Sequence, residues 1–252
     1  MVKMIVTDLD GTLLRTDKTI SDYSKSVLKR CREKGHKIVF ATARSLHNLQ
    51  VTGYIDEVPT DSLVVTNGAF VYADRNLIYE GTLPRDVTES LLTELNGSPE
   101  VTSIGARTRE RKYSSNPNPQ IKTESYHDFR TPLSETISHI SFHTENASYA
   151  KSIITKYPQL VIYHVSAESF CDVNPRNCTK ATEVKILAEH YNTTLSVVIA
   201  FGDDNNDIDM LRECGTGVAV ANAIDEAKAA SDYICDTNDN DGVARWLEEN
   251  IQ

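Results

Sequence analysis

Short strand patterns and helical patterns alternate at both ends of this sequence, and the alternation limits the folds that the chain can adopt. Near the start, apolar and β-branched runs lie at Met4–Thr7, Lys37–Ala41 and Leu63–Thr66, with a helical pattern beginning near Ser21. The alternation returns after about residue 178. The expected elements there are helices at Ala181–Tyr191, Ile208–Arg212, Asp225–Ala230 and Gly242–Asn250, and strands at Val197–Phe201 and Gly217–Val220. Such strand–helix–strand units predict a Rossmann-like α/β core, a parallel sheet with helices on both faces.

The sequence between about residues 83 and 177 has a different character. Its strand patterns alternate more between apolar and polar residues. The expected elements are strands at Ile137–His143, Val161–Val165 and Phe170–Val173, and helices at Arg85–Leu95 and Ala147–Tyr157. We therefore expect an inserted α+β domain at 83–177, with residues 1–82 and 178–252 forming the core domain.

Three apolar strands of the core domain end in polar residues. The first ends at Asp8-Leu9-Asp10, the second at Thr42-Ala43-Arg44, and a later one at the acidic run Gly202–Asp207. The carboxyl ends of parallel strands lie on one edge of the sheet, where open α/β folds bind their ligands. These three distant segments are therefore predicted to converge.

Asp8 and Asp10 lie two residues apart at the end of a strand pattern. Residues two apart in an extended backbone point to the same side, so both carboxylates would face one site with Asp203 and Asp207. Two such charges about 4 Å apart repel by roughly 4 kcal/mol at an effective dielectric constant of about 20. Mg²⁺ takes oxygen ligands and commonly joins carboxylates to phosphate oxygens. The acidic set therefore predicts a divalent cation site, where Lys180 could add a second positive charge for an anionic substrate.

Each motif alone also has a simpler interpretation. Asp-x-Asp-Gly is common in turns and calcium loops, but the EF-hand pattern fails because Leu14 and Ile20 stand where that loop needs ligands. The run Gly202–Asp207 alone could be an acidic helix cap. The joint occurrence of both motifs with Thr42 and Lys180 favours a catalytic site.

The composition argues against several classes of partner. The 252 residues carry a formal charge of −10 without a long basic run, which disfavours nucleic acid and anionic membranes and favours a small ligand. The five cysteines are scattered and form neither a CxxC pair nor a cluster with histidine, so we expect them to be reduced. Because neither a signal-peptide pattern nor an apolar span is visible, we expect a cytoplasmic protein without a membrane partner.

The motifs together resemble the haloacid dehalogenase (HAD) superfamily, and most of all its Cof-type sugar-phosphatase branch. They span nearly the whole chain in the family's order. The matching pieces are Asp8-Leu9-Asp10-Gly11-Thr12, Ala41-Thr42-Ala43-Arg44, Asn67-Gly68-Ala69, Lys180, Gly202–Asp207, Asn222-Ala223 and Asp241-Gly242-Val243-Ala244. The resemblance implies that residues 83–177 form the large cap domain of that branch.

The resemblance also implies a role for each catalytic residue. Asp8 would be the nucleophile that accepts the phosphoryl group as an aspartyl phosphate, and Asp10 would protonate the leaving alcohol and then activate water. Thr42 and Lys180 would hold the phosphoryl oxygens. In this family an aspartate at the position of Asp10 accompanies phosphatases and phosphomutases. The implied activity is a Mg²⁺-dependent phosphatase that acts on small phosphorylated metabolites, such as sugar phosphates.

Two further sets of residues follow from the resemblance. The implied metal site consists of Asp8, Asp10 through its backbone carbonyl, Asp203, Asn206 and Asp207. The expected substrate-binding residues are Gly11, Thr12, Thr42, Ala43, Arg44, Asn67, Lys180 and Asn206, with Arg44 and Asn67 included because both follow strand ends on the predicted site edge. Two departures from the family pattern are Ala181, where related sequences often have glycine, and Asp204, which adds a charge beside Asp203.

Two other functions stay open at this point. A phosphomutase would share the nucleophile, and a metabolite-binding protein without activity would be built on a silent phosphatase. The intact pair of Asp8 and Asp10 argues against the second. The sequence leaves open which phosphate ester is the substrate, which cap residues contact it, and whether the protein is a monomer or a homodimer.

Overall fold

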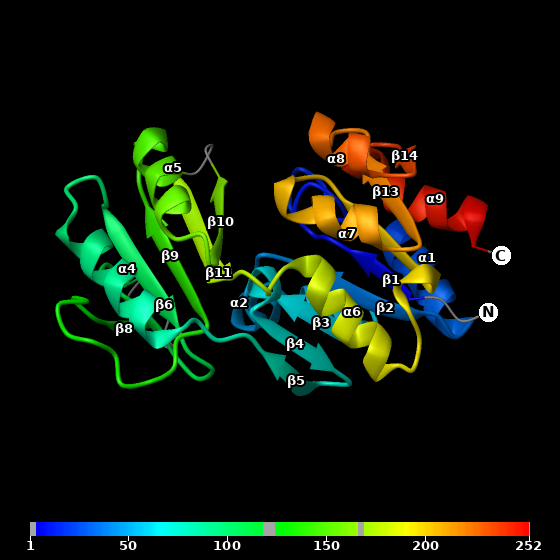
Figure 1. Cartoon of the computed structure of the whole chain (residues 1–252). Helices are drawn as coiled ribbons and strands as arrows, with labels where there is room; N and C mark the ends of the chain where they lie inside the picture. The colour runs from blue at the N-terminus through cyan, green and yellow to red at the C-terminus, as the bar shows by residue number, and fades with distance from the viewer. Residues whose placement is uncertain (1–3, 118–123, 166–168, 252) are drawn as a thin grey trace. The chain divides into compact units, whose positions relative to one another are not determined.

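The computed structural model describes residues 4–117, 124–165 and 169–251, and the chain divides into two compact units (Figure 1). The first unit combines Met1–Tyr79 with Thr179–Gln252, and the second is the continuous segment Glu80–Cys178. The second unit is thus inserted into the first. Across the residues described, no helix is long and apolar enough to cross a membrane.

The first unit is built on an eight-stranded sheet with the strand order β14-β13-β12-β1-β2-β3-β4-β5 (Figure 1). Its strands are β1 (Met4–Thr7), β2 (Lys37–Ala41), β3 (Ser62–Val65), β4 (Phe70–Ala73), β5 (Asn76–Glu80), β12 (Val198–Gly202), β13 (Thr216–Val220) and β14 (Tyr233–Cys235). Neighbouring strands are parallel from β14 to β3, and β4 returns antiparallel to β3. In this register Met4 lies between Val198 of β12 and Lys37 of β2.

The central strands are apolar along their length because helices cover both faces of the sheet. All four residues of β1 are buried. Ile5 belongs to a hydrophobic cluster that includes residues of α1 (Asp22–Glu33) and α9 (Gly242–Asn250). Met4 and Val6 belong to another cluster, with residues of α6 (Lys180–His190). The predicted parallel sheet with helices on both faces is confirmed.

The other helical segments of the first unit are short. They are α2 (Leu46–Thr52), α3 (Tyr54–Glu57), α7 (Ile208–Glu213) and α8 (Asp225–Ala230), with 3₁₀ turns at Thr66–Gly68, Leu195–Val197, Asn205–Asp207 and Asn238–Asn240. Two predicted boundaries move by one residue, because Thr66 begins a 3₁₀ turn after β3 and Val197 ends another before β12. Helix α1 begins as predicted: the Ser21 hydroxyl accepts a hydrogen bond from the Ser24 N–H at 3.0 Å.

The second unit has its own sheet of six strands in the order β10-β11-β9-β6-β7-β8. The strands are β6 (Ser103–Arg107), β7 (Lys112–Ser114), β8 (Glu124–Tyr126), β9 (His139–His143), β10 (Leu160–Val165) and β11 (Phe170–Pro175). Alternate strand residues such as Ile104, Ile140 and Phe142 form one hydrophobic cluster with α4 (Arg85–Gly97) and α5 (Ala147–Lys156). Both helices therefore pack on the same face of this sheet.

Candidate active site

Three adjacent strands bring the predicted polar residues to one edge of the sheet. Asp8 follows β1 directly, and its backbone N–H donates to the Phe201 carbonyl of β12 at 3.0 Å. Thr42 follows β2, and Asp203 follows β12. Because the strand order is β12-β1-β2, the three segments predicted to converge are neighbours.

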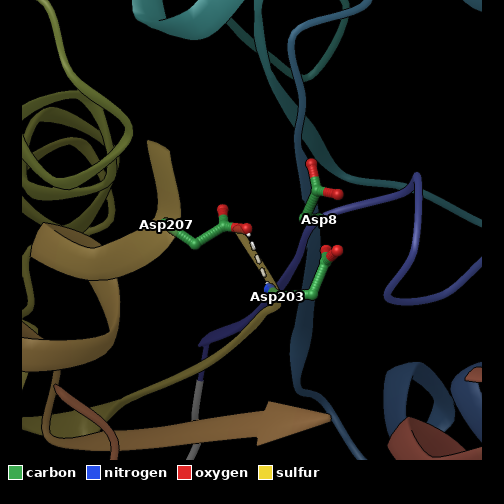
Figure 2. Close-up of side chains that lie close together, drawn as sticks. All are labelled: Asp8, Asp203 and Asp207. Atoms are coloured by element: carbon green, nitrogen blue, oxygen red, sulfur yellow. Dashed lines mark hydrogen bonds between the residues drawn. The ribbon is translucent and has the colours of Figure 1, made fainter. Parts of the chain in front are cut away.

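Asp8, Asp203 and Asp207 form an acidic cluster at this edge (Figure 2). Each offers a carboxylate oxygen, and these three atoms lie within 4.8 Å of one another. Asp8 and Asp207 are buried. Buried carboxylates are unfavourable unless positive charge, hydrogen bonds or protonation compensates them, so the cluster favours a cationic partner.

Lys180 supplies one positive charge to the cluster. It is the first residue of α6, whose N-terminus is capped by the Thr179 side chain. The Lys180 Nζ donates to Asp8 Oδ1 at 2.6 Å and to Asp207 Oδ1 at 2.7 Å, and the side chain is 1% exposed. Lys180 provides one positive charge against three carboxyl groups, so the cluster keeps an excess of negative charge when all three are ionised.

Burial and neighbouring charges shift the pKa values of this cluster. Burial raises the pKa of Asp8 well above its ordinary value, against the opposing effect of Lys180, and the Asp207 and Asp203 charges raise it further. Burial raises the pKa of Asp203 to about 7, and the Asp207 charge adds to that rise. Burial by itself would lower the pKa of Lys180, but Asp207 and Asp8 raise it, so the ammonium stays protonated. Without a further cation, the cluster retains protons that exposed carboxyl groups would lose.

The side chains of the cluster fit Mg²⁺. This ion prefers oxygen ligands and usually combines one or two carboxylates with water and phosphate oxygens. Both oxygens of Asp207 already accept hydrogen bonds, Oδ1 from Lys180 and Oδ2 from the N–H groups of Asp203 and Asp204. Direct coordination therefore suits Asp8 and Asp203, whereas Asp207 suits a supporting position.

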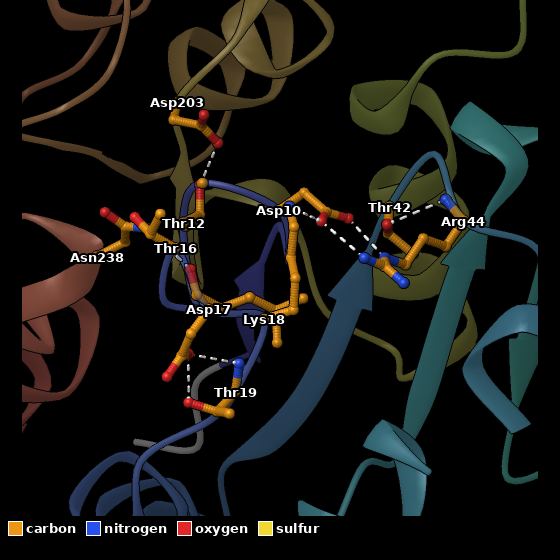
Figure 3. Close-up of polar contacts among 12 residues, drawn as sticks. Asp10, Thr12, Thr16, Asp17, Lys18, Thr19, Thr42, Arg44, Asp203 and Asn238 are labelled. Atoms are coloured by element: carbon orange, nitrogen blue, oxygen red, sulfur yellow. Dashed lines mark hydrogen bonds and ion pairs between the residues drawn. The ribbon is translucent and has the colours of Figure 1, made fainter. Parts of the chain in front are cut away.

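Asp10 lies outside the acidic cluster and is paired with two cationic side chains (Figure 3). Arg44 contacts both of its oxygens, from Nε at 2.5 Å and from Nη2 at 2.7 Å. Lys18 Nζ donates to Asp10 Oδ1 at 2.8 Å. Partial burial by itself would raise the pKa of Asp10, but the hydrogen bonds and charges of Arg44 and Lys18 lower it. The two aspartates of the first motif therefore have opposite electrostatic environments.

Gly11 and Thr12 join this motif to the strand end that carries Asp203. Gly11 has a φ of +82°, and a Cβ atom there would lie 2.3 Å from Asp203 Oδ2. Both the backbone conformation and the close approach therefore require glycine. The Thr12 hydroxyl donates to Asp203 Oδ1 at 2.5 Å (Figure 3), which fixes the orientation of that carboxylate.

The segment after β2 approaches the site through its backbone and through Arg44. Thr42 is buried, and its Oγ1 accepts a hydrogen bond from the Arg44 N–H at 3.1 Å. Ala43, between them, is exposed. The segment therefore places one small hydroxyl, one exposed alanine and one guanidinium at the edge of the sheet.

Asn67 and Asn206 contact each other rather than lying apart on separate segments. The Asn206 Nδ2 donates to Asn67 Oδ1 at 2.8 Å, and the Asn67 N–H donates to the Thr42 carbonyl at 3.1 Å. Asn67 sits in a turn where it, Thr66 and Gly68 all have positive φ. This contact links the acidic run after β12 to the turn after β3.

Sequence reasoning did not identify Lys18 as part of the site. Its backbone has a φ of +65°, and the Tyr54 hydroxyl donates to its carbonyl at 2.8 Å. The unusual backbone conformation directs a lysine from a polar turn toward Asp10. A lysine among Thr and Asp residues in a turn gives no signal that could have revealed this contact.

Comparison with known proteins gives a consistent relationship along the whole chain. The sequence model of the haloacid dehalogenase-like hydrolases matches residues 5–247. A 5-amino-6-(5-phospho-D-ribitylamino)uracil phosphatase of Bacillus subtilis, YitU, is 29% identical over 265 residues, covering 98% of this chain and 96% of that protein. A Haemophilus influenzae protein named provisionally as a phosphatase is 32% identical, covering 99% of this chain and 98% of that protein.

Solved structures show the same fold. A phosphatase of the haloalkanoate enzyme superfamily from Bacteroides thetaiotaomicron is 26% identical, with a TM-score of 0.83 over 99% of this chain and 95% of its own. A haloacid dehalogenase-like hydrolase from Bacillus subtilis is 22% identical, with a TM-score of 0.85 and complete coverage of both chains (100% each). At this lower identity the second comparison concerns the fold alone.

Proposed function

The chain belongs to the haloacid dehalogenase-like hydrolases, and from this membership we propose that it is a Mg²⁺-dependent phosphatase acting through an aspartyl phosphate. Its substrates are small phosphorylated metabolites. The observation that carries the proposal is the buried Lys180, whose Nζ bridges Asp8 and Asp207 beside Asp203. This arrangement combines a positioned carboxylate nucleophile with positive charge where a phosphoryl group would develop negative charge.

In the first step Asp8 attacks phosphorus. Lys180 holds Asp8 Oδ1 at 2.6 Å, so this oxygen is fixed and the other can form the new O–P bond. The bond between phosphorus and the ester oxygen breaks, and the leaving oxygen takes a proton from Asp10. The buried Thr42 hydroxyl and the Lys180 ammonium bind the phosphoryl oxygens. The products of this step are an aspartyl phosphate and an alcohol.

In the second step Asp10 accepts a proton from water, which attacks phosphorus and releases phosphate from Asp8. Arg44 and Lys18 hold Asp10 ionised in the free site, which is the state needed for this step. The first step needs a protonated Asp10. We propose that substrate oxygens take over hydrogen bonds of Arg44 and Lys18, and that the negative charge of the bound phosphate beside this partly buried carboxyl group raises the pKa of Asp10 enough for it to carry the proton.

Asp8 and Asp203 would hold Mg²⁺ directly, together with the backbone carbonyl of Asp10. Asp207 and Asn206 would support them. When bound, the ion supplies positive charge to the phosphoryl oxygens. Gly11 and Thr12 support this site by holding Asp203 close.

We propose that the second unit, Glu80–Cys178, selects the substrate, because the first unit supplies the reacting groups. Because the chain is similar to a phosphatase of 5-amino-6-(5-phospho-D-ribitylamino)uracil, this ester should be included in a substrate panel. We propose that the protein acts in the cytoplasm, in line with five scattered cysteines that form neither a CxxC pair nor a cluster with histidine.

A panel of phosphorylated metabolites tests the proposal. Phosphate release is measured for wild type, Asp8→Asn and Asp209→Asn, with Mg²⁺ and with a chelator. Asp209 is an exposed acid on α7 paired with Arg212, so its variant is the matched control. We expect turnover that requires Mg²⁺, survives in Asp209→Asn and vanishes in Asp8→Asn.

Other outcomes point to the alternative functions. Transfer of phosphate to a second sugar instead of water would identify a phosphomutase. Tight binding of a metabolite with no turnover under any condition would show that the site is a binding site only.

A further inference from the structure

The chain segment from Asn222 to Asp241 contacts the loop that directly follows Asp10. We call these the C-terminal segment (residues 222–241) and the acid loop (residues 11–19). The C-terminal segment holds the backbone of the loop: Asn222 Nδ2 donates to the Gly11 carbonyl at 2.7 Å, and Asn238 Nδ2 donates to the Leu14 carbonyl at 2.9 Å. The two asparagines are joined, since the Asn238 N–H donates to Asn222 Oδ1 at 2.9 Å.

Two aspartates of the C-terminal segment hold the side chains that follow. Asp241 accepts from Arg15 through both carboxylate oxygens, at 2.7 Å from Nη2 and 3.3 Å from Nε. The hydroxyl of Ser21, which caps α1, also donates to Asp241, at 2.7 Å. Asp239 accepts from the N–H and the hydroxyl of Thr16, both at 2.8 Å. The C-terminal segment therefore binds the acid loop along its length, and Asp241 makes the one bidentate ion pair among these contacts.

The acid loop also carries the groups that contact the reacting carboxylates (Figure 3). Thr12 donates to Asp203 Oδ1, and Lys18 donates to Asp10 Oδ1 at 2.8 Å. The C-terminal segment binds Gly11, which precedes Thr12, and residues 14–16, which lie between Thr12 and Lys18 in the sequence. A shift of the loop would therefore move Thr12 and Lys18 relative to Asp203 and Asp10.

From these contacts we propose that the C-terminal segment is a positioning device for the acid loop, with Asp241 and Arg15 as its principal residues. In this proposal both residues act indirectly, by fixing the positions of Asp10 and Lys18. This inference rests on the proposed function, because Asp10 must reach the leaving oxygen to protonate it. Misplacing a catalytic group by about 1 Å can slow a reaction on the order of a hundredfold.

A purely structural role is the competing explanation, since the ion pair joins two distant parts of the first unit. The structure offers a matched control. Arg30 of α1 pairs with Glu248 of α9, and so also joins the start of the chain to its end without touching the acid loop. Arg15→Met and Arg30→Met each remove one such arginine, but only the first removes a contact that holds the acid loop.

The test uses two substrates that differ in their need for proton donation. The leaving group of an alkyl phosphate is a basic alkoxide, which needs the proton of Asp10. The leaving group of p-nitrophenyl phosphate is a stable phenolate, which needs that proton far less. The readout is kcat/KM at saturating Mg²⁺, because it reports the steps up to aspartyl phosphate formation and excludes the second step, in which Asp10 acts as a base for both substrates. For Arg15→Met we expect kcat/KM on the alkyl ester to fall about tenfold or more. On p-nitrophenyl phosphate we expect kcat/KM to change less than about twofold, because the Asp8 and Lys180 geometry is intact. Arg30→Met should behave as wild type with both.

A second variant keeps the test decisive if Arg15→Met does not fold. Asp241 has a φ of 57°, a conformation that asparagine tolerates, so Asp241→Asn preserves the backbone while removing the charge that holds Arg15. It should give the same substrate-dependent loss. Arg15→Lys, which keeps the charge without the bidentate contact, should recover part of the alkyl ester activity.

Equal losses of kcat/KM on both substrates, or no loss on the alkyl ester, would overturn the positioning role. If the wild-type protein hydrolyses neither these esters nor any member of the metabolite panel, the proposed function fails instead.

Discussion

Burial and the Asp207 charge raise the pKa of Asp203 to about 7, far above the ordinary value of 3.8. At a pH between 3.8 and about 7, Asp203 is protonated in the folded protein and ionised in the unfolded chain. Stability contributed by this proton is complete below pH 4 and disappears as pH rises toward 7. For metal-free protein we therefore expect the melting temperature to fall between pH 5 and pH 7.5, in part because of this residue.

The measurement is a melting curve in chelator at both pH values, repeated with saturating Mg²⁺. The ion binds ionised carboxylates, so it should stabilise more at the higher pH. Asp203→Asn removes the titrating group and should flatten the dependence in chelator and abolish most of the Mg²⁺ effect. A wild-type melting temperature that rises with pH in chelator would contradict this account.

Removal of Lys180 should strongly destabilise the first unit. Its ammonium is buried between two carboxylates, and deleting one partner of a buried ion pair typically costs about 3–5 kcal/mol. We expect Lys180→Met to lower the free energy of unfolding by an amount of this order, as measured by urea denaturation at neutral pH. Lys185→Met, on the exposed face of the same helix, is the control and should change stability little. Similar small effects for both would show that protonation of the carboxylates compensates the loss.

At the scale of elements, the strands around the site could be predicted because parallel strands buried on both faces are continuous apolar runs. β1 and β2 have the predicted bounds, and polar residues follow them as expected. The hairpin of β4 and β5 was missed. Its two-residue turn, Asp74-Arg75, has positive φ at both residues, a conformation that Asn-Gly would have signalled and that Asp-Arg does not.

In the second unit, β6, β7 and β8 were missed for a related reason. β7 and β8 have three residues each, too few for a pattern to show, and β6 contains Gly105 and Ala106, which have weak strand preference. Their place in the sheet is set by pairing with β9 and with each other. Likewise, the pairing of Lys18 with Asp10 depends on one turn conformation, which local sequence does not specify.

The turn after β3 gives a prediction at this scale. Gly68 has a φ of +97°, and an added Cβ would lie 2.6 Å from Glu183 Oε2 and 3.1 Å from the Thr179 backbone. Gly68→Ala should therefore destabilise the protein by about 2 kcal/mol or more in urea denaturation. Gly53, with a φ of +79° and nothing within 4 Å, isolates the backbone cost, and Gly53→Ala should lose only about 1 kcal/mol. Equal losses of stability in Gly68→Ala and Gly53→Ala would show that the close approach of residue 68 to Glu183 and Thr179 adds no cost.

At the scale of the whole molecule, two units with separate hydrophobic clusters share one chain. All of the predicted acidic and cationic groups of the site belong to the first unit. Binding of Mg²⁺ should therefore slow hydrogen exchange in β1 and β12 and leave β9 and β11 nearly unchanged. Exchange measured by mass spectrometry with and without Mg²⁺ tests this, and Asp203→Asn serves as the control that should not respond. An equal gain of protection in both sheets would show that the units open together.

The position of β1 in the middle of its sheet also bears on how the chain folds as it leaves the ribosome. β1 pairs with β2, made soon afterwards, and with β12, which is made only after the entire second unit. One edge of β1 therefore remains unpaired until β12 has been synthesised. The continuous segment Glu80–Cys178 can complete its own sheet before that point. An unpaired apolar strand is prone to pair wrongly. For this protein, the interval before β12 emerges is thus the stage at which a nascent chain most needs protection by chaperones.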